Sequence, residues 1–554
     1  MLKVDRFWWA LLALIPALFV FIFFIWPVLS LIFTGITEDG RLEFQSIAQI
    51  LKRSRTWGVV GQTLLQAFSA TALSVLVGIP AAFILYRLQF PGRKALRALL
   101  TVPFVLPTVV VAAAFMALYG PGGMLNFLGL DRTFVVLIMA LTFFNVTVVM
   151  RIVGGFWENL DPRQTEAARM LGASSGQAFL NITLPRLWRP IASAASLVFL
   201  FCATSFGVVF VLGGKKYANI ETEIYRSTMQ LLDLKTSAVL SILQIIIVVL
   251  ALYFSSRLRR STSSVSSVTD RVVAFRSKDH LSILLIFIIT IALLHALPIY
   301  SLISRSFRST AGDWSFENYL LLFSPPESSP LAQGISGAIW LSLSYALIAM
   351  LASVLLGLIT VFVVTRKFLS RRVKRGQSVY EYTMMMPLGV SAVTLGLGLL
   401  ITMHKPFGIG IDLRSTLVLI PIAQTLIALP LVIRTLMPRL QNISQRTKDA
   451  GIMLGASPWK VILTIELPLL KNAVAIAAGF AFAASLGEFG AAAFLVRSND
   501  KTLPVIIAQL LSHQDPMSHN MGIAAAVLLG AITASVMVAA ESLSLKSKVG
   551  WVAW

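Results

Sequence analysis

Charged residues are scarce in this sequence. Only 13% of its 554 residues are charged, whereas 57% are hydrophobic. Soluble domains carry about 25% charged residues, so the low charge excludes a large soluble domain. The hydrophobic residues come in runs of about 20, the length that spans a bilayer, and not in the short alternating segments of membrane β-barrels. The sequence therefore predicts an all-α integral membrane protein.

Reactive side chains are scarce as well. Cys202 is the single cysteine, which excludes an intrachain disulfide and a cysteine metal cluster. The five histidines are dispersed and give no pair at the spacing of metal ligands. We therefore expect no metal site and no catalytic constellation, and we interpret the chain as a protein other than an enzyme.

Acidic residues are outnumbered, with 24 Asp and Glu against 46 Lys and Arg, which gives a net charge of +22. In a soluble protein this excess would suggest nucleic-acid binding, but no basic segment here carries interleaved aromatic residues. In a membrane protein, Lys and Arg gather in cytoplasmic loops. We therefore expect a lipid bilayer around the chain and no nucleic-acid partner.

Twelve apolar runs are long enough to cross a membrane. They lie near 8–33, 59–86, 96–119, 133–153, 190–213, 236–256, 281–303, 337–365, 381–403, 415–436, 471–496 and 520–541. Most basic residues fall on one side if both termini are cytoplasmic, so the positive-inside rule predicts that topology. The polar segment Ser261–Asp270 is typical of a flexible linker. We expect one six-helix half at 1–260, a cytoplasmic linker at 261–280 and a second half at 281–554.

The two halves share a repeat. Residues Glu158–Gly207 align without a gap with Gln441–Gly490. The identical stretches include Met170–Ser174 with Met453–Ser457, Leu184-Pro185 with Leu467-Pro468, and Phe206-Gly207 with Phe489-Gly490. Both copies follow the fourth span of their half, so the repeat is parallel. A parallel repeat implies a pseudo-two-fold axis along the membrane normal and a transport pathway between the halves.

The first copy has clear helix signals. Asp161 and Pro162 favour a helix start, Gly172 favours a stop, and Ser174 or Ser175 can cap a second short helix. Two matched copies facing the cytoplasm favour a docking platform for a two-fold partner. The alternative is an ordinary hairpin on the membrane surface.

These residues resemble the EAA loop of binding-protein-dependent ABC importer permeases. The first copy carries the resemblance at Glu166, Ala167, Ala168, Gly172, Leu184 and Pro185, and the second at Asp449, Ala450, Gly455, Leu467 and Pro468. The second copy departs from the pattern by Asp449 for Glu and Gly451 for the second Ala. The resemblance covers nearly the whole chain and implies a type I importer permease with both halves fused, in the bacterial inner membrane.

In that family the loops form coupling helices that dock on two cytoplasmic ATPase subunits, while an external binding protein delivers the solute. By this resemblance the coupling helices are about Glu158–Ala178 and Gln441–Val461. The chain has no G-x-x-x-x-G-K-[ST] phosphate loop. We therefore expect ATP and Mg on the ATPase partner and no cofactor on this chain.

The segment after the second loop indicates which group of these permeases the chain resembles most. Ser485–Gly490 and Thr502–Pro504 resemble the sulfate, molybdate, ferric-iron and thiamine permease group. Fused halves favour its ferric-iron and thiamine members, and Phe90–Arg93, Leu212–Gly214 and Glu221–Tyr225 are most similar to thiamine permeases. We expect thiamine or its phosphates as the solute, with ferric iron as the alternative and phosphonate, sulfate or molybdate as further ones.

A secondary transporter of the major-facilitator type also has twelve spans. It would place the strongest internal match near the second and third spans, whereas this chain places it between the fourth and fifth.

Glu488 is the one acid deep within a predicted span, if the eleventh span runs past it, and intramembrane acids are usually functional. Contact with a cationic solute and support of a gate both remain open. The glycines favour close helix approach. The pathway or gate residues that we expect are Ser205, Gly207, Glu488, Phe489 and Gly490. We also expect Pro103, Pro107 and Pro387 to bend the third and ninth spans.

Overall fold

The chain is almost entirely helical where its structure is described. The computed structural model describes residues 3–38, 41–42, 44–100, 102–161, 163–259, 273–274, 277–326, 331, 334–366, 371–410, 412–497, 500–513 and 515–545. Strands within these residues form two short pairs. The antiparallel pair is β1 (Thr37–Glu38) with β2 (Arg41–Leu42), and the parallel pair is β3 (Leu88–Gln89) with β4 (Val273–Ala274). Most of the expected linker at 261–280 lies outside the described residues.

Ten helical segments of the described chain are long and apolar enough to cross a membrane. They are Trp8–Ile36, Ser54–Arg87, Phe134–Glu158, Ser175–Ala203, Leu234–Phe254, Ile283–Ser306, Ser336–Thr365, Leu419–Gln441, Trp459–Leu486 and Pro516–Ala540. The pair Val373–Gly389 and Ala392–Gly408, bent by 99°, is an eleventh if it is counted as one span. The all-α membrane fold is therefore confirmed, with ten or eleven spans in the described residues where about twelve were expected.

The third and ninth spans are the broken ones. The expected span 96–119 divides into α5 (Arg93–Leu99), α6 (Val102–Val105) and α7 (Thr108–Tyr119), and the expected span 381–403 into α18 (Arg371–Met385), η6 (Met386–Gly389) and α19 (Ala392–Thr402). Pro107 is the N-cap of α7, and Pro387 lies in the 3-10 turn before α19. Proline lacks the N–H that a continuous helix needs. The breaks at Pro107 and Pro387 agree with the expected bends, whereas Pro103 lies within α6.

The fifth and eleventh spans end earlier than expected. Helix α11 (Leu184–Ala203) and helix α23 (Leu467–Leu486) stop about ten residues before 213 and 496. After each break the chain forms a short helix, η4 (Val209–Gly213) or α24 (Ala492–Leu495). Hydropathy missed both breaks because the residues around them are as apolar as the helices.

The remaining helices complete each half. They are α3 (Phe44–Lys52), α4 (Ser54–Arg87), η2 (Asn126–Leu128), α8 (Phe134–Glu158), α12 (Ile220–Met229), α13 (Leu234–Arg259), α16 (Glu317–Phe323), α17 (Ser336–Thr365), η7 (Pro406–Gly408), η8 (Leu413–Ser415), α20 (Leu419–Gln441), α25 (Leu503–Ser512) and α26 (Pro516–Leu545). The helices α4 and α8 pack closely where a Cβ on Gly78 would lie 2.6 Å from Val149 Cβ. The helices α17 and α20 repeat this contact, because a Cβ on Gly357 would lie 2.6 Å from Val432 Cγ1. The duplication thus extends into the cores of both bundles.

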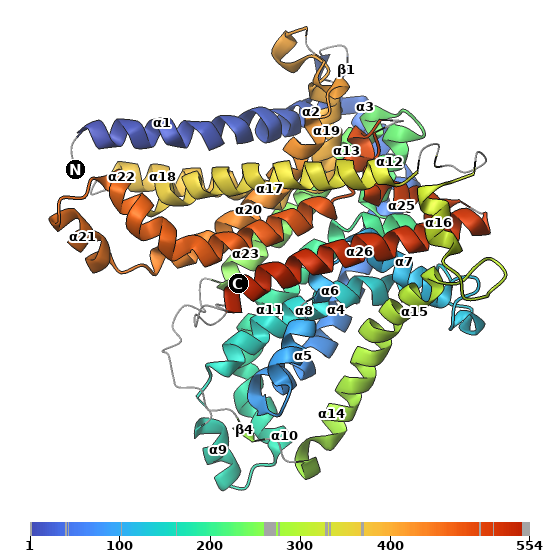
Figure 1. Ribbon diagram of the computed structural model, residues 1–554, viewed down its shortest axis with the longest axis horizontal. Helices are drawn as coiled ribbons and strands as arrows, with labels where there is room; N and C mark the ends of the chain where they lie inside the picture. Colours follow the sequence, from blue (N-terminus) through green and yellow to red (C-terminus); the bar gives the residue numbers. More distant parts are fainter. Residues whose placement is uncertain are drawn as a thin grey trace.

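The first span of each half packs on the other half. In the first half this span consists of α1 (Lys3–Val20), η1 (Phe21–Ile25) and α2 (Trp26–Ile36), and Figure 1 shows α1 lying along α17. The Trp9 ring stacks on Trp459 at 5.6 Å, and Trp26 stacks on Phe407 at 5.0 Å.

The reciprocal span consists of α14 (Ser277–Ile291), η5 (Ala292–Ala296) and α15 (Leu297–Ser306), where Ser301 Oγ donates to the Ala117 carbonyl at 2.9 Å. The first span of each half therefore packs on the other half and holds the two halves together.

Four π-helical turns recur at matched places. Each directly precedes a helix with proline in its first turn: η1 before Pro27, η5 before Pro298, η3 (Phe179–Thr183) before Pro185, and η9 (Ile462–Glu466) before Pro468. A proline clashes with the carbonyl four residues earlier, and a π turn widens the helix by one residue. The irregularity therefore follows from the duplicated proline positions.

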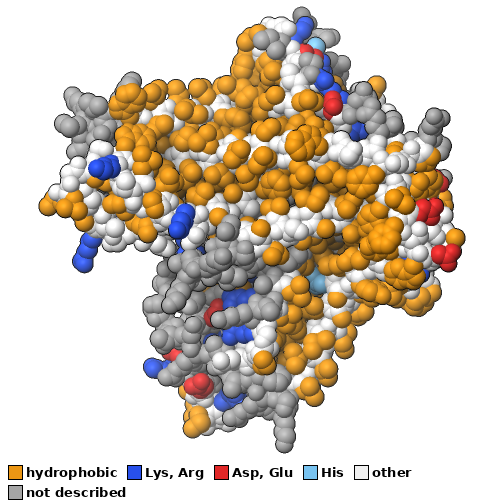
Figure 2. All heavy atoms as spheres, in the orientation of Figure 1, with side chains coloured by type: hydrophobic (Ala, Val, Ile, Leu, Met, Phe, Trp, Pro, Cys, Tyr) orange, Lys and Arg blue, Asp and Glu red, His pale blue; other side chains and the backbone are white. Residues whose placement is uncertain are grey.

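The two helix bundles lie apart at the ends that carry the loop helices α9, α10, α21 and α22. Figure 1 shows α9 and α10 at the lower end of one bundle and α21 and α22 at the left end of the other, far apart in this view. Figure 2 shows hydrophobic side chains over the middle of the molecule, while blue and red charged side chains gather toward its ends. Exposed residues of this apolar belt include Leu14, Leu18, Leu285, Ile289, Leu351 and Leu355. Such a belt is suited to lipid tails.

Candidate functional site

The first candidate docking loop joins α8 to α11 and consists of two short helices. Helix α9 (Arg163–Met170) starts where Arg163 N–H donates to Asp161 Oδ1 at 3.0 Å. Helix α10 (Ser175–Ala178) is closed by a capping box between Ser174 and Gln177. Between them Gly172 has φ +92°, a conformation that only glycine adopts easily. The expected start, stop and Ser174 cap are confirmed, although Pro162 itself lies outside the described residues.

The second loop repeats this arrangement between α20 and α23. Helix α21 (Gln445–Met453) is followed by Gly455, with φ +82°, and then by α22 (Pro458–Val461). Ser457 Oγ accepts from Lys460 N–H at 3.3 Å. Each loop therefore holds two short helices around a glycine turn, within the ranges Glu158–Ala178 and Gln441–Val461 that we expected for the coupling helices.

The tips of both loops expose the same apolar pair. Met170 and Leu171 are each 89% exposed, and so are Met453 and Leu454. Exposed apolar residues at one matched position in two copies are typical of a docking surface.

The motif residues fall into two groups around these tips. Glu166, Ala167, Asp449 and Ala450 are exposed on α9 and α21, whereas Leu184 and Leu467 are half-buried where α11 and α23 begin, and Pro185 and Pro468 follow them. Gly451, the departure from alanine, is buried, and a Cβ there would lie 2.7 Å from Ile465 Cδ1. The second copy therefore has little room for the alanine of the motif.

A buried ion-pair cluster anchors the second loop. The Glu466 side chain is 1% exposed and accepts from Arg366 Nη2 and Lys448 Nζ, each at 2.8 Å. Arg366 also lies 4.9 Å from the Trp9 ring centre, and Trp9 stacks on Trp459 of α22. The loop is thus tied to α17 and to the exchanged helix α1.

The first loop is anchored differently. Thr183 occupies the position that matches Glu466. The anchor is instead Glu158 at the end of α8, which accepts from Arg93 at 2.8 Å and from Arg97 at 3.2 Å. Because Glu158 is more exposed than Glu466, at 23% against 1%, the two loops are held with unequal strength.

Away from the loops, the halves meet through a matched pair of rings. Phe206 and Phe489 stack with their centres 5.0 Å apart and their planes 21° apart. Each lies at the break after α11 or α23. Phe210 and Tyr225 also pack against this pair, and Phe494 packs on Tyr225 at 5.5 Å. We call these five side chains the ring cluster.

The two glycines beside these rings lie in matched contacts. A Cβ on Gly207 would collide with Thr108 at the start of α7, and one on Gly490 would lie 3.0 Å from Ala392 at the start of α19. Ser205 is half-buried, and its carbonyl accepts from Asn219 Nδ2 at 2.7 Å. The structure therefore brings Ser205, Gly207, Phe489 and Gly490 together at the contact between the halves.

Glu488 is buried but lies outside the helix in which we expected it. It follows the end of α23, and its Oε1 and Oε2 accept from Ala491 N–H at 2.8 Å and Ala492 N–H at 3.0 Å. Both oxygens are thus occupied by the first turn of α24. The geometry favours support of the gate over contact with a solute.

A second buried acid was missed by sequence reasoning. Glu221 on α12 is 0% exposed, and its Oε2 accepts from Ser391 Oγ at 2.8 Å, across the contact between the halves. Hydropathy places it in a polar loop between spans, so its burial had no signal in the sequence. Within the described residues, no group of three or more His, Cys, Asp or Glu side chains is placed to hold a metal.

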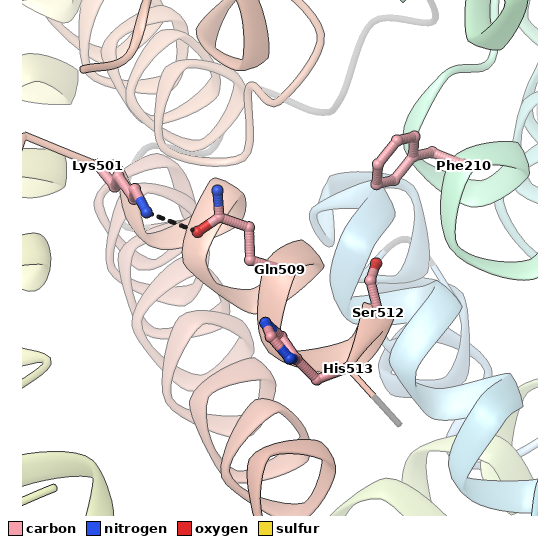
Figure 3. A pocket seen from close by; sticks show the side chains of 5 residues that line it. All are labelled: Phe210, Lys501, Gln509, Ser512 and His513. Atoms are coloured by element: carbon pink, nitrogen blue, oxygen red, sulfur yellow. Dashed lines mark hydrogen bonds between the residues drawn. The ribbon is translucent and has the colours of Figure 1, made fainter. Parts of the chain in front are cut away.

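A pocket opens beside the ring cluster. Its volume is about 410 Å³, and it is lined by Phe210, Lys501, Gln509, Ser512 and His513. Figure 3 shows Phe210 on one side and the polar residues of α25 on the other, with Lys501 Nζ donating to Gln509 Oε1 at 3.0 Å. The pocket shares Phe210 with the rings at the contact of the halves, so it adjoins the gate.

Comparison with known proteins agrees with this arrangement. Residues 74–260 and 354–548 match the family described as "Binding-protein-dependent transport system inner membrane component", once in each half. The chain is 29% identical to the thiamine transport system permease protein ThiP of Escherichia coli, over 82% of this chain and 84% of that one. It is 25% identical to ThiP of Haemophilus influenzae, over 84% of each chain, and 22% identical to the probable ABC transporter permease protein y4fN of Sinorhizobium fredii, over 98% of each.

Two family matches in one chain show a fused permease of two halves. The apolar helices and the family match agree on a multi-pass permease of the inner membrane. The chain belongs to the family of binding-protein-dependent transport system inner membrane components, as the permease subunit of an ABC importer.

Proposed function

We propose that this permease imports thiamine, or a phosphate ester of thiamine, that an external binding protein delivers. Relatives named as thiamine permeases align with more than four fifths of the chain. The same relatives do not name ferric iron, which stays the alternative solute.

The exposed Met-Leu tips carry the second part of the proposal, that each loop docks on one subunit of a pair of cytoplasmic ATPases. Four large apolar side chains, each 89% exposed, are unfavourable in water. An ATPase subunit that received one pair would bury them. ATP and Mg would then be bound by those subunits and not by this chain.

Docking on cytoplasmic ATPases would also determine on which side of the membrane the two termini lie. Trp9, near the start of α1, stacks on Trp459 of the second loop, so α1 starts on the side of the docking loops. ATPase subunits lie in the cytoplasm, and the N-terminus would therefore be cytoplasmic. The C-terminus would lie on the same side, as the positive-inside rule predicts.

The conformation supports alternating access. The docking loops of the two halves stand apart (Figure 1), while Phe206 and Phe489 hold the halves together where their rings stack. We interpret this as the state that is open toward the cytoplasm. Closure of the ATPase pair would bring the loops together and separate Phe206 from Phe489.

The solute is tested in proteoliposomes that contain the permease, its ATPase and its binding protein. Thiamine, thiamine phosphate and ferric iron are supplied separately to the outside. We expect uptake of a thiamine compound that requires both ATP and the binding protein. Uptake of iron with none of thiamine would contradict the proposal.

Docking is tested with the double variant G172V/G455V. Valine is strained at the positive φ of both turns, so the tips should shift and thiamine uptake should fall while the protein stays in the membrane. The matched control is G129V, at φ +62° in the turn after η2, where a side chain meets no atom within 4 Å. Undisturbed uptake in the double variant would count against docking at these loops.

A further inference from the structure

Glu221 is buried without a positive partner in the described part of the chain. Its Oε2 accepts from Ser391 Oγ, and the polar side chain of Gln244 lies beside the carboxyl group. Gln244 Nε2 donates to the Ala203 carbonyl, and Glu221 Oε1 has no donor within hydrogen-bond distance in the described residues. Glu223, two residues along α12, shows the contrast, because Arg55 binds both of its oxygens at 2.7 and 3.1 Å. A buried acid is costly unless it is paired, so an unpaired one within a membrane protein is usually functional.

The other buried acids of the chain have structural roles that Glu221 lacks. Glu488 holds two amides of α24 with its two oxygens, and Glu466 holds Arg366 and Lys448. Glu221 alone among these three keeps an oxygen free of partners in the described residues.

Aromatic rings lie on the same face of α12. Tyr225 follows Glu221 by four residues, which places both side chains on one side of the helix. The Tyr225 ring lies 5.6 Å from Phe206 and 5.2 Å from Phe210. The faces of aromatic rings attract cations, and more strongly when water is excluded.

The two halves contribute jointly to this place. Phe489, Phe494 and Ser391 belong to the second half, and Glu221, Tyr225, Phe206 and Phe210 to the first. The rings now stack on one another. Separation of the halves would unstack these rings and expose their faces, and one of them, Phe210, already lines the pocket (Figure 3).

We propose that the Glu221 carboxylate and the ring cluster form an intramembrane binding site for an organic cation that carries an aromatic ring, occupied when the halves separate. This inference rests on the proposed function, because the positively charged thiazolium ring of thiamine has this chemistry. The carboxylate selects the charge and the rings select the flat apolar body.

The test uses the complete transporter in proteoliposomes, with loaded binding protein at saturation. In E221Q the amide oxygen can still accept from Ser391, but the charge is lost. We expect thiamine uptake to fall by about tenfold or more, the usual effect of removing one member of a buried charge pair. ATP hydrolysis stimulated by the binding protein should stay within about twofold, so more ATP is consumed for each thiamine imported.

Two further variants separate charge recognition from structure. E223Q makes the same change on the same helix outside the site, and its uptake should resemble that of the unchanged protein. S391A removes the hydrogen bond between the halves and keeps the charge, so its uptake should fall far less than that of E221Q.

Three results overturn the inference, and one tells against the proposed function instead. Normal uptake by E221Q, equal losses in E221Q and S391A, or loss of stimulated ATP hydrolysis together with uptake would each assign Glu221 a structural role. Absence of thiamine uptake by the unchanged transporter would instead refute the proposed function.

Discussion

The ion-pair cluster of the second loop makes a quantitative prediction. Substitution of Glu466 by alanine removes two hydrogen bonds of 2.8 Å and leaves Arg366 and Lys448 without their acceptor. The side chains of these two residues are only 17% and 13% exposed, so water replaces the lost carboxylate poorly. Breaking a buried pair in this way costs about 3–5 kcal/mol. We expect that loss to appear locally, because Glu466 joins the loop to the membrane helices.

The assay is amide hydrogen exchange on the purified permease–ATPase complex. A local loss of about 3 kcal/mol raises the exchange rate of the affected amides by roughly a hundredfold. The affected amides should be those of α21, α22 and η9, while α9 and α10 of the first loop keep their exchange rates. ATP hydrolysis stimulated by the binding protein should fall as well, because the loosened loop transmits less motion.

The matched control lies in the first half. E158Q weakens the pairs with Arg93 and Arg97, in which the acid is 23% exposed against 1% for Glu466, and an ion pair contributes less where water reaches it. Exchange should therefore change less in E158Q than in E466A. Unchanged exchange around η9 in E466A, or equal effects of both variants on their own loops, would refute the reasoning.

Further predictions concern packing and docking. G78A places a Cβ 2.6 Å from Val149, and G357A places one 2.6 Å from Val432. Each variant should destabilise the protein by about 1–3 kcal/mol and lower its Tm in detergent. Adding V149A to G78A, or V432A to G357A, should restore part of the lost stability. Replacement of Met170 and Leu171 by serine should weaken ATPase binding in a pull-down and leave Tm unchanged, because both side chains are 89% exposed; the same pair of changes at Leu14 and Leu18, in the lipid belt, should leave ATPase binding unchanged. W9A removes a stacking contact on Trp459, worth about 0.5–1.5 kcal/mol, and should increase amide exchange in α22 without altering α10.

The sequence was sufficient for the features that depend on local signals. Low charge and long apolar runs predicted the membrane fold, and the repeat predicted two equivalent loops with glycine turns at Gly172 and Gly455. Prolines at 107 and 387 predicted the bends. Each of these follows from backbone chemistry within a few residues.

Features that depend on long-range contacts could not be predicted in this way. The breaks after Ala203 and Leu486 lie in apolar sequence, so hydropathy extended the spans through them. Glu221 and Glu466 stand in segments read as loops, and only the packing of distant helices buries them. Which half receives the first span is likewise decided by surface fit, for which a single sequence has no local signal.

The exchange of first spans has a consequence for biosynthesis. The segment α1–α2 leaves the ribosome before its packing partner α17, which begins only at Ser336. At about 5–20 residues per second, roughly 15–60 s pass before that partner exists. During this interval α2 can already pack on α13, where Gly35 approaches Ala238 and Ile242, but the face that later contacts Trp459 has no partner from the second half. The first span is therefore synthesised, and can enter the bilayer, before the helix of the second half on which it packs exists.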